Sequence, residues 1–565
     1  MAPGFALARA IDLSERRRVS ALSLTESLRE AERLVDSALV DGVAVHEYLE
    51  RLLAESCPRR GRPRGLSVRT LLVAIQLGAF AGRFFLTELT DLLGPLGPAT
   101  RARLGLKRRG EPVTYRQICY LVTRIDDVLR ASFRYDDGRL VEGLATFDGV
   151  FNALATSGAH AGAAVASSIA IDGSDIPTWG TSSPREELAW REDEEGRHHI
   201  VRDEDGGAHW EKARVVTDTD AAWRGSREVE GKPAHFGYSL TVAISAREEN
   251  GPDVPRAALA ARLRPVTVQD KMMGLACAGE VAERRGHLGD VLVDRGYTNS
   301  LDGRDFLLPI RAMGGDPVFD LTAYQVGPQG TLRGAIIIDG RPYSPSTPRS
   351  LHRIDRPTGT QNGTYMPAHR AVREYQEKIA AREIYALVPH GSVRPNLTQV
   401  FQCPGAAGKL DCPLRPARRG LREGALPVLN APAHPADDSV CATAFTTFSL
   451  EELPLFQRHV HGSRAWTSSY SRRQTSVETY FANIKDAAGE NFARGRIRVM
   501  GIVKIGLFVA ATLASANRRL ALSFDPERIA KRRAQRRPGR PPRHRRLTYR
   551  QVVEDATASK VVIRT

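Results

Sequence analysis

Three acidic residues of this chain stand where carboxylates do chemistry in α/β proteins. Asp172 ends the strand-like run SSIAID, and Asp294 follows the fully apolar triplet Val291–Val293. Such a triplet is typical of a strand buried on both faces of a sheet, and open α/β sheets bind ligands beyond the carboxyl ends of their strands. Glu478 borders the apolar stripe of an amphipathic helix in SVETYFANIK. Carboxylates hold hard divalent cations, so the three positions are candidates for metal-dependent chemistry.

The two aspartates have an ordinary alternative, because an Asp at a strand end is commonly a turn former or a helix cap. Strand alternation predicts that Ile169 and Ile171 lie on one face of the first strand and Ala170 and Asp172 on the other. Asp175 lies three residues further along and is the alternative candidate for the first position.

Glu478 is tested by its neighbours in the helix. A surface Glu that stabilises its own helix has a basic partner three or four residues away. Those positions hold Gln474, Thr475, Phe481 and Ala482. Lys485 lies on the same face, about 10 Å along the helix axis, too far for a strong direct pair. The sequence therefore predicts an unpaired Glu478 suited to bind a metal, with Lys485 contacting a phosphate of the same ligand.

Three segments together resemble the catalytic blocks of bacterial insertion-sequence DDE transposases with a Tyr-Arg-Glu-Lys signature. They are IDGSD, VLVDRGYT and YSRRQTSVETYFANIK. The resemblance covers roughly residues 160–304 and 466–520. It implies a ribonuclease-H-like α/β core, interrupted before its last acidic residue by a β-rich insertion. Here 183 residues separate Asp294 from Glu478, in keeping with that arrangement.

The resemblance implies that Asp172, Asp294 and Glu478 are the catalytic and metal-binding triad. Asp172 is preferred to Asp175 because the family's Asp immediately precedes Gly. The implied cofactor is a pair of Mg²⁺ ions, with Mn²⁺ as a substitute. Two such ions activate the attacking oxygen and stabilise the leaving oxygen when a phosphodiester is cut.

The last block departs from the family pattern. Lys485 matches the signature Lys, but the family spacing puts the Tyr and the Arg at positions occupied by Ser471 and Gln474. Tyr470 and Arg473 are each displaced by one residue. The residues expected to contact DNA in this region are Tyr470, Arg472, Arg473 and Lys485.

The charge balance also points to a polyanion. The chain carries a net charge of +16. Between Arg528 and Arg550 there are eleven Lys or Arg residues and no acidic residue. We expect this tail to bind DNA, with a solvated charged tail as the alternative. The DNA contacts expected in the tail are Arg537, Arg540 and Arg543.

The chain is expected to divide into five parts. A helical N-terminal domain (1–155) carries a basic loop, RRGRPRG, and is either a DNA-binding unit or a helical core with a charged loop. The first part of the catalytic core (156–304) mixes strands with a helix, and residues 181–230 form an excursion between two strands. An insertion domain (305–465), the C-terminal helices of the core (466–524) and the basic tail (525–565) follow.

Several classes of protein are excluded or disfavoured. The N-terminal residues lack the apolar core of a signal peptide, which predicts a cytoplasmic, nucleoid-associated protein. The longest apolar run, Ile505–Ala516, is too short to cross a bilayer and reads as a buried helix. Neither a Walker A loop nor a dinucleotide fingerprint occurs, so no nucleotide cofactor is implied. Cys403, Cys412 and Cys441 are either a zinc site or reduced structural cysteines.

The expected function is that of an insertion-sequence DNA transposase, which cuts and joins DNA by two-metal phosphoryl transfer. Its partners would be the double-stranded DNA of transposon ends and target, bound by a homodimer in the synaptic complex. The alternatives are a metal-dependent nuclease without strand transfer and a non-catalytic or domesticated DNA-binding relative.

Overall fold

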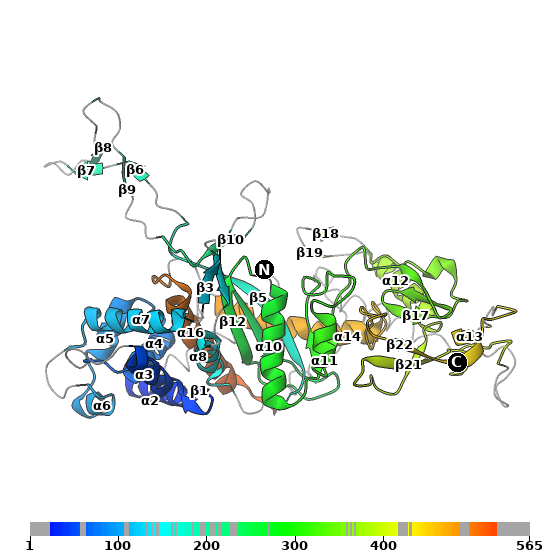
Figure 1. Ribbon diagram of the computed structural model, residues 1–565, viewed down its shortest axis with the longest axis horizontal. Coiled ribbons are helices and arrows are strands. Elements are labelled where there is room, and N and C mark those ends of the chain that lie inside the picture. The colour runs from blue at the N-terminus through cyan, green and yellow to red at the C-terminus, as the bar shows by residue number, and fades with distance from the viewer. Residues whose placement is uncertain are drawn as a thin grey trace.

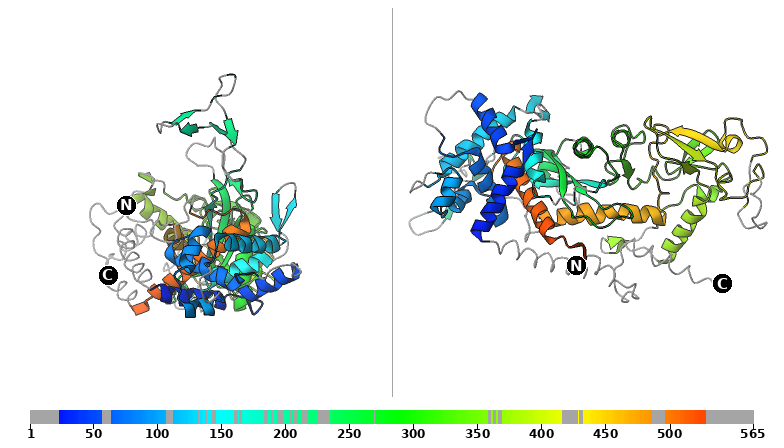
Figure 2. Two further views of the ribbon diagram at one scale, coloured as in Figure 1. Left: turned by 90° about the vertical axis from the view of Figure 1, so that its left-hand side faces the viewer. Right: turned by 90° about the horizontal axis from the view of Figure 1, so that it is seen from below.

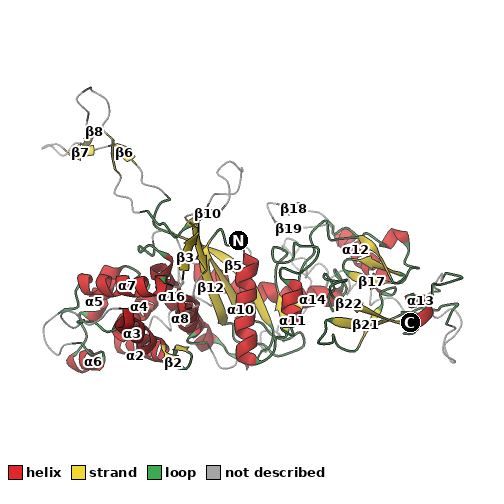
Figure 3. Cartoon of the chain, in the orientation of Figure 1, coloured by secondary structure: helices red, strands yellow, loops and turns green. Residues whose placement is uncertain are grey.

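The computed structural model describes residues 23–527 with internal gaps. The described ranges are 23–56, 64–106, 112–131, 133–136, 139–142, 146–159, 163, 166–182, 186–188, 190–192, 198–200, 202, 205, 210–212, 217–224, 235–268, 270–357, 360–361, 364–365, 369–415, 428, 432–485 and 496–527. The molecule is elongated, with helices at one end, a sheet in the middle and an insertion at the other end (Figures 1 and 3). It is a mixed α/β protein with a curled mixed sheet, which confirms the predicted class.

Helices make up most of the N-terminal end. Their bounds are α2 (Leu24–Ser37), α3 (Val45–Ser56), α4 (Val68–Ala81), α5 (Leu86–Leu93), α6 (Pro98–Arg103), α7 (Tyr115–Arg130) and α8 (Thr146–Thr156). Two short hairpins join them, β1 (Leu39–Val40) with β2 (Val43–Ala44) and β3 (Phe133–Asp136) with β4 (Arg139–Glu142). Thr114 and Gln117 form a capping box at the start of α7, and this helix buries its apolar stripe.

The central sheet contains the three strands expected from the sequence. Its strands are β5 (Ile169–Pro177), β10 (Ala222–Arg224), β11 (His235–Ser245), β12 (Ala258–Pro265), β13 (Asp290–Leu292) and β14 (Asp316–Val318). β11 pairs antiparallel with β5, β10 and β12, whereas β13 runs parallel to both β5 and β14. The order across the sheet is therefore β12-β11-β5-β13-β14, with β10 beside the start of β11.

Helices cover both faces of this sheet. Ile169 and Ile171 lie in the same buried cluster as the apolar side of α10 (Asp270–Arg285) and α11 (Leu307–Ala312). Ala170 lies in the cluster on the opposite face, with side chains of α8 and of the C-terminal helices. The alternation predicted for β5 is confirmed, and it directs Asp172 towards the C-terminal helices.

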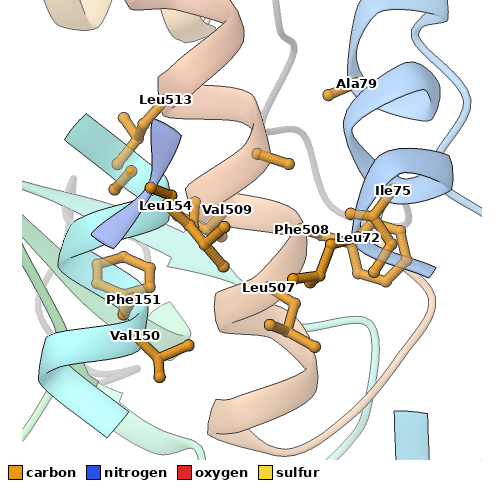
Figure 4. Close-up of a cluster of buried hydrophobic side chains, with 14 of the residues drawn as sticks. Leu72, Ile75, Ala79, Val150, Phe151, Leu154, Leu507, Phe508, Val509 and Leu513 are labelled. Carbon is orange, nitrogen blue, oxygen red and sulfur yellow. The ribbon is translucent and has the colours of Figure 1, made fainter. Parts of the chain in front are cut away.

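The N-terminal helices share their core with the C-terminal helix α16 (Ile502–Ser523). Figure 4 shows Leu507, Phe508 and Val509 of α16 between side chains of α4 and α8. The run Ile505–Ala516 is a buried helix, as predicted. The predicted domain 1–155 is thus completed by a helix more than 300 residues away in the chain.

An excursion leaves the sheet between β5 and β11. It contains the short paired strands β6 (Glu186–Leu188) with β9 (Trp210–Lys212) and β7 (Trp190–Glu192) with β8 (His198–Ile200). Figure 1 shows these strands standing away from the body. The structure thus places paired strands within the predicted excursion, residues 181–230.

The insertion begins later than predicted. Since β14 pairs with β13, the boundary expected at residue 304 falls before the last strand of the central sheet. Beyond it lie β15 (Pro328–Leu332), β16 (Ala335–Ile338), β17 (Arg341–Tyr343), the 3₁₀ turn η1 (Arg349–Leu351), β18 (Thr360–Gln361), β19 (Thr364–Tyr365), α12 (His369–Glu383), β20 (Val388–His390), β21 (Thr398–Gln402), α13 (Val440–Thr443) and β22 (Phe445–Ser449). The insertion has hydrophobic clusters of its own.

Among the described residues, no single helix is long and apolar enough to cross a membrane. By length and composition alone, the bent pair of α4 and α5 passes the same test jointly. Most of α4 is buried in the helical core.

Candidate active site

Asp172 lies near the middle of β5, on the face directed towards the C-terminal helices. Its side chain is 21% exposed, and its Oδ1 accepts a hydrogen bond of 2.9 Å from the backbone N–H of Gly173. Burial raises the pKa of Asp172 from 3.8 to about 6, and the charges of Asp294 and Glu478 add to the effect while Arg473 opposes it. The fold therefore holds this carboxylate in a place that disfavours its charge.

Asp294 comes two residues after the end of β13. β13 runs parallel to β5, with Leu292 opposite Ala170, so Asp294 and Asp172 reach the same region of the sheet. Its Oδ1 accepts a hydrogen bond of 2.9 Å from the N–H of Gly296, which closes a tight Asx-type turn. The side chain is 41% exposed.

Glu478 lies at a break in the last long helical segment before α16. α14 (Arg464–Arg473) passes through the π-helical turn η2 (Gln474–Glu478) into α15 (Thr479–Lys485). Val477, Phe481 and Ile484 are buried, as the helical spacing predicts. Figure 2 shows these helices running lengthwise between the two ends of the molecule.

Arg473 brings the three carboxylates together. Its Nη2 lies 2.6 Å from Asp172 Oδ2 and 3.9 Å from Asp294 Oδ2. Its Nη1 lies 3.2 Å from Glu478 Oε1. Side chains from two strands and one helix thus meet around one guanidinium, and the three acids predicted from the sequence share one site.

The prediction that Glu478 lacks a partner in its own helix is wrong. Its partner is Arg473, five residues earlier. Residues five positions apart do not share a face of a regular α-helix. A π-helical turn contains one extra residue and brings positions i and i+5 onto one face, and such turns occur often at functional sites. The extra residue of this turn lies between Arg473 and Glu478.

Arg472 does not face the site. It is 1% exposed and forms a buried ion pair with Asp290 at the start of β13. It also donates to the backbone carbonyls of Arg247, at 2.9 Å, and Ser469, at 3.0 Å. The expected DNA contact of Arg472 is at odds with this position, because the side chain is enclosed by the fold. Its observed role is to fasten α14 to the sheet.

Tyr470 lies within α14, and Lys485 lies at the end of the same helical segment. Tyr470 is half-buried and stacks on Trp466, with ring centroids 5.0 Å apart. Burial raises the pKa of Tyr470 to about 12, so its hydroxyl keeps its proton at neutral pH. Lys485 is the last residue of α15 and is exposed. Of the two, Tyr470 lies within electrostatic range of Arg473 and Asp294.

Asp175 belongs to a different cluster. It pairs with Arg224 at 3.0 Å, and the same guanidinium pairs with Asp270 at 3.0 Å. This ion-pair cluster uses Asp175, so Asp172 remains the candidate for the first acidic position.

Tyr297 is a residue that the sequence argument missed. It is buried beside Phe306, and its hydroxyl has no hydrogen-bond partner within the described part of the chain. Burial raises the pKa of Tyr297 well above its usual value, and the charges of Asp172, Asp270 and Asp294 add to this. The motif VLVDRGYT contained the residue, but only the fold shows that it lies within electrostatic range of the carboxylates.

Two other predictions concern sites elsewhere in the chain. Arg537, Arg540 and Arg543 lie outside the described residues, as does most of the N-terminal basic loop. Cys403, Cys412 and Cys441 are free thiols. Burial and the charges of Cys403 and Cys412 raise the pKa of Cys441 to about 11.

The donor atoms of the triad fit a hard divalent cation in chemical kind. All are carboxylate oxygens, the ligands that Mg²⁺ and Mn²⁺ prefer, and they already surround a positive group. Among the described residues, no three acidic, His or Cys side chains converge closely enough to coordinate one ion. In this arrangement the Arg473 guanidinium lies between the three carboxylates.

Comparisons with protein-family models, with curated proteins and with solved structures find nothing that matches this chain. Fold and site define it as a mixed α/β protein. At one region of its sheet lies a carboxylate triad centred on an arginine.

Proposed function

We propose that this protein is a DNA transposase of an insertion sequence that acts by metal-dependent phosphoryl transfer. The observation that carries the proposal is the meeting of Asp172, Asp294 and Glu478 around one cationic group. They come from three elements far apart in sequence. Each is an acidic residue of one of the three segments that resemble the DDE blocks. A buried carboxylate beside two others costs stability, which is typical of a site selected for chemistry.

The sheet supports the same proposal. Its first three strands in chain order, β5, β11 and β12, are antiparallel neighbours, and β13 and β14 then extend the sheet parallel to β5. This order is the one expected of a ribonuclease-H-like core. The insertion between β14 and α14 agrees with the expected interruption before the last acidic residue.

Asp172, Asp294 and Glu478 would hold two Mg²⁺ ions, or Mn²⁺ in their place. When bound, these ions activate the attacking oxygen and stabilise the departing one. In the first reaction, water attacks a phosphorus at a transposon end and the P–O3′ bond breaks, freeing a 3′-hydroxyl. In the second, that hydroxyl attacks a target phosphorus, a new P–O bond forms, and the target's own 3′ oxygen leaves.

The chain's own residues bind and align the DNA. Lys485, exposed at the end of α15, contacts backbone phosphates. The Tyr470 hydroxyl donates a hydrogen bond to a phosphate oxygen. The basic tail adds contacts that do not depend on base sequence. Synapsis of two ends calls for a homodimer, and the reaction takes place in the cytoplasm on nucleoid DNA.

One experiment separates this proposal from its rivals. The purified protein is incubated with the DNA that flanks its gene and with Mg²⁺. Strand-transfer products support the transposase. Cleavage without joining would leave a nuclease, and a mobility shift without cleavage would leave a non-catalytic DNA-binding protein.

The variant Glu478→Gln tests the site. It removes one negative charge from the triad while the half-exposed side chain keeps its size. We expect DNA binding to stay within about twofold and cleavage to fall about 10³-fold or more, since the triad supplies several kcal/mol of transition-state stabilisation. The matched control is Glu451→Gln, an exposed acid of the insertion. Glu451→Gln should cleave like the unaltered protein. Equal cleavage by Glu478→Gln would remove Glu478 from the mechanism.

A further inference from the structure

We propose that Arg473 is an internal counterion of the triad, and that it makes divalent-cation binding depend on DNA. This inference rests on the proposed function. In the protein alone, Arg473 pairs with the three carboxylates and offsets part of their negative charge. When DNA enters, the guanidinium moves to a backbone phosphate and releases the carboxylate oxygens to the metal.

The guanidinium of Arg473 is already in contact with oxygen atoms of the carboxylates. Its two terminal nitrogens lie 2.6 Å from Asp172, 3.2 Å from Glu478 and 3.9 Å from Asp294. Its side chain is only 11% exposed, so water screens these contacts weakly. Arg473 is thus the cation of the site.

A divalent cation needs the same oxygens. Hard cations bind carboxylates directly, and a positive guanidinium within contact distance of the same oxygens repels them. The triad carries at most three negative charges, and the positive charge of Arg473 offsets one of them, which lowers the attraction of the site for a divalent ion. Metal binding therefore requires that Arg473 leave the carboxylates or that another anion enter beside it.

DNA supplies that anion. A guanidinium offers a planar fork of donors that matches a phosphate as well as it matches a carboxylate. The Arg473 Nε is buried and has no hydrogen-bond partner among the described residues, so the present arrangement leaves one donor unused. A phosphate bound beside the triad would satisfy the fork and leave the carboxylates to the metal.

The neighbouring residue allows the side chain to move while the helix stays in place. Arg472 holds α14 to the sheet through Asp290 and two backbone carbonyls. The π-helical turn η2 directs Arg473 and Glu478 to one face. Exchange of partners therefore needs a rotamer change of Arg473 and no shift of the backbone.

The consequence is a reciprocal coupling. If DNA raises the affinity for the metal by a given factor, the metal raises the affinity for DNA by the same factor. The protein would then assemble its reactive site only on DNA.

The test measures Mg²⁺ binding by calorimetry on the full chain, with and without a 30-base-pair duplex (about one binding footprint). Without DNA, Arg473→Gln is expected to bind Mg²⁺ about tenfold more tightly than the unaltered protein. The duplex should tighten Mg²⁺ binding about tenfold in the unaltered protein and less than about threefold in Arg473→Gln. Arg473→Lys, which keeps the charge but loses the fork, should lie between the two and guards against a misfolded Gln variant.

Arg464→Gln is the matched control, because Arg464 is an exposed arginine at the start of the same helix. It should leave Mg²⁺ binding without DNA unchanged. Equal or weaker Mg²⁺ binding by Arg473→Gln without DNA would overturn the inference and leave the proposed function standing. If no form of the protein binds Mg²⁺ with or without DNA, the proposed function fails as well.

Discussion

At the scale of single residues, the carboxylate site lowers the stability of the fold. Asp172 is buried beside two other carboxylates and relies on Arg473 for compensation. Arg472, its neighbour in sequence, is enclosed and bound to Asp290. Adjacent arginines therefore differ in role: Arg472 builds the scaffold, and Arg473 faces the chemistry.

Replacing Asp172 by Asn should stabilise the fold at high pH. Because its pKa is raised from 3.8 to about 6 in the folded state, the stability that Asp172 contributes is full below about pH 3.8 and is lost as the pH rises through 6. Asn keeps the shape without the charge. We expect the variant to unfold with a free energy about 1–2 kcal/mol larger than the unaltered protein at pH 8, and with no advantage at pH 4. Denaturant unfolding at both pH values measures this, and cleavage should be lost.

Asp175→Asn is the matched control on the same strand. Asp175 is paired with Arg224, so its removal breaks an ion pair and should bring no gain at pH 8. A less stable Asp172→Asn at pH 8 would contradict the account of the buried charge.

At the scale of elements, the π-helical turn η2 decides which side chains of the helix meet the sheet. It inserts one residue between α14 and α15 while both helices keep their buried faces. If the same residues formed a regular α-helix, Arg473 and Glu478 would be five positions apart and would point about 140° from each other. In this sequence the turn is what brings Arg473 and Glu478 onto one face.

Deletion of Gln474 should convert η2 into a regular α-helical turn. Arg473 would then precede Glu478 by four residues and still share its face, as i and i+4 do in an α-helix. We expect cleavage within about tenfold of the unaltered protein and an equal or higher melting temperature, since π turns are strained. Gel assays of cleavage and thermal unfolding provide the measurements.

Deletion of Ala482 serves as the comparison. It removes an exposed residue after the turn and rotates Ile484 and Lys485 by about 100°, taking a buried side chain out of the core. This variant should lose stability and activity. Equal losses of cleavage and of melting temperature in the two deletion variants would mean that the helix does not tolerate removal of a residue at η2.

At the scale of the whole molecule, α16 joins parts of the chain that the sequence separates. It packs against α4 and α8 of the helical end, and its Asn517 reaches the sheet. The Asn517 amide accepts hydrogen bonds from Ala258 N–H at 2.7 Å and Tyr480 O–H at 3.2 Å, and donates to the carbonyls of Ala155 and Ala258 at 3.2 Å. One buried amide thus links α8, β12, α15 and α16.

Asn517→Ala should destabilise the whole protein. It leaves buried backbone groups of Ala258 without their partners, and each unsatisfied group costs about 1–3 kcal/mol. We expect a loss of about 2–4 kcal/mol in a single cooperative unfolding transition, followed by circular dichroism. Asn483→Ala, on the partly exposed side of α15, should cost less than about 0.5 kcal/mol. Separate unfolding of the helical end in Asn517→Ala would show that the two parts do not share a core.

Removal of the chain after Asp525 should weaken DNA binding without changing the melting temperature. α16 ends at Ser523, so the deletion spares the described fold. The deleted segment holds eleven basic residues between Arg528 and Arg550. Each lost phosphate contact lowers the slope of log affinity against log salt by about 0.9. An unchanged slope in a salt titration would count against a DNA role for the tail.

The sequence by itself determined the features that repeat over short distances. Alternation in SSIAID placed Asp172, the apolar triplet before Asp294 marked a central strand, and helical spacing set Glu478 beside a buried stripe. The α/β class and the buried helix at Ile505–Ala516 followed from the same local patterns. These features were predictable because a strand or helix buries one face at a regular interval, and the apolar residues of the sequence recur at the same interval.

Only the tertiary structure decided how these pieces combine. It placed Arg473 among the carboxylates, buried Arg472 against Asp290, and extended the sheet beyond residue 304. It also completed the N-terminal core with α16. Each of these depends on packing between residues far apart in the chain. The π-helical turn also depends on tertiary packing. The helices before and after it each bury one face, and they do so whether or not an extra residue lies between them.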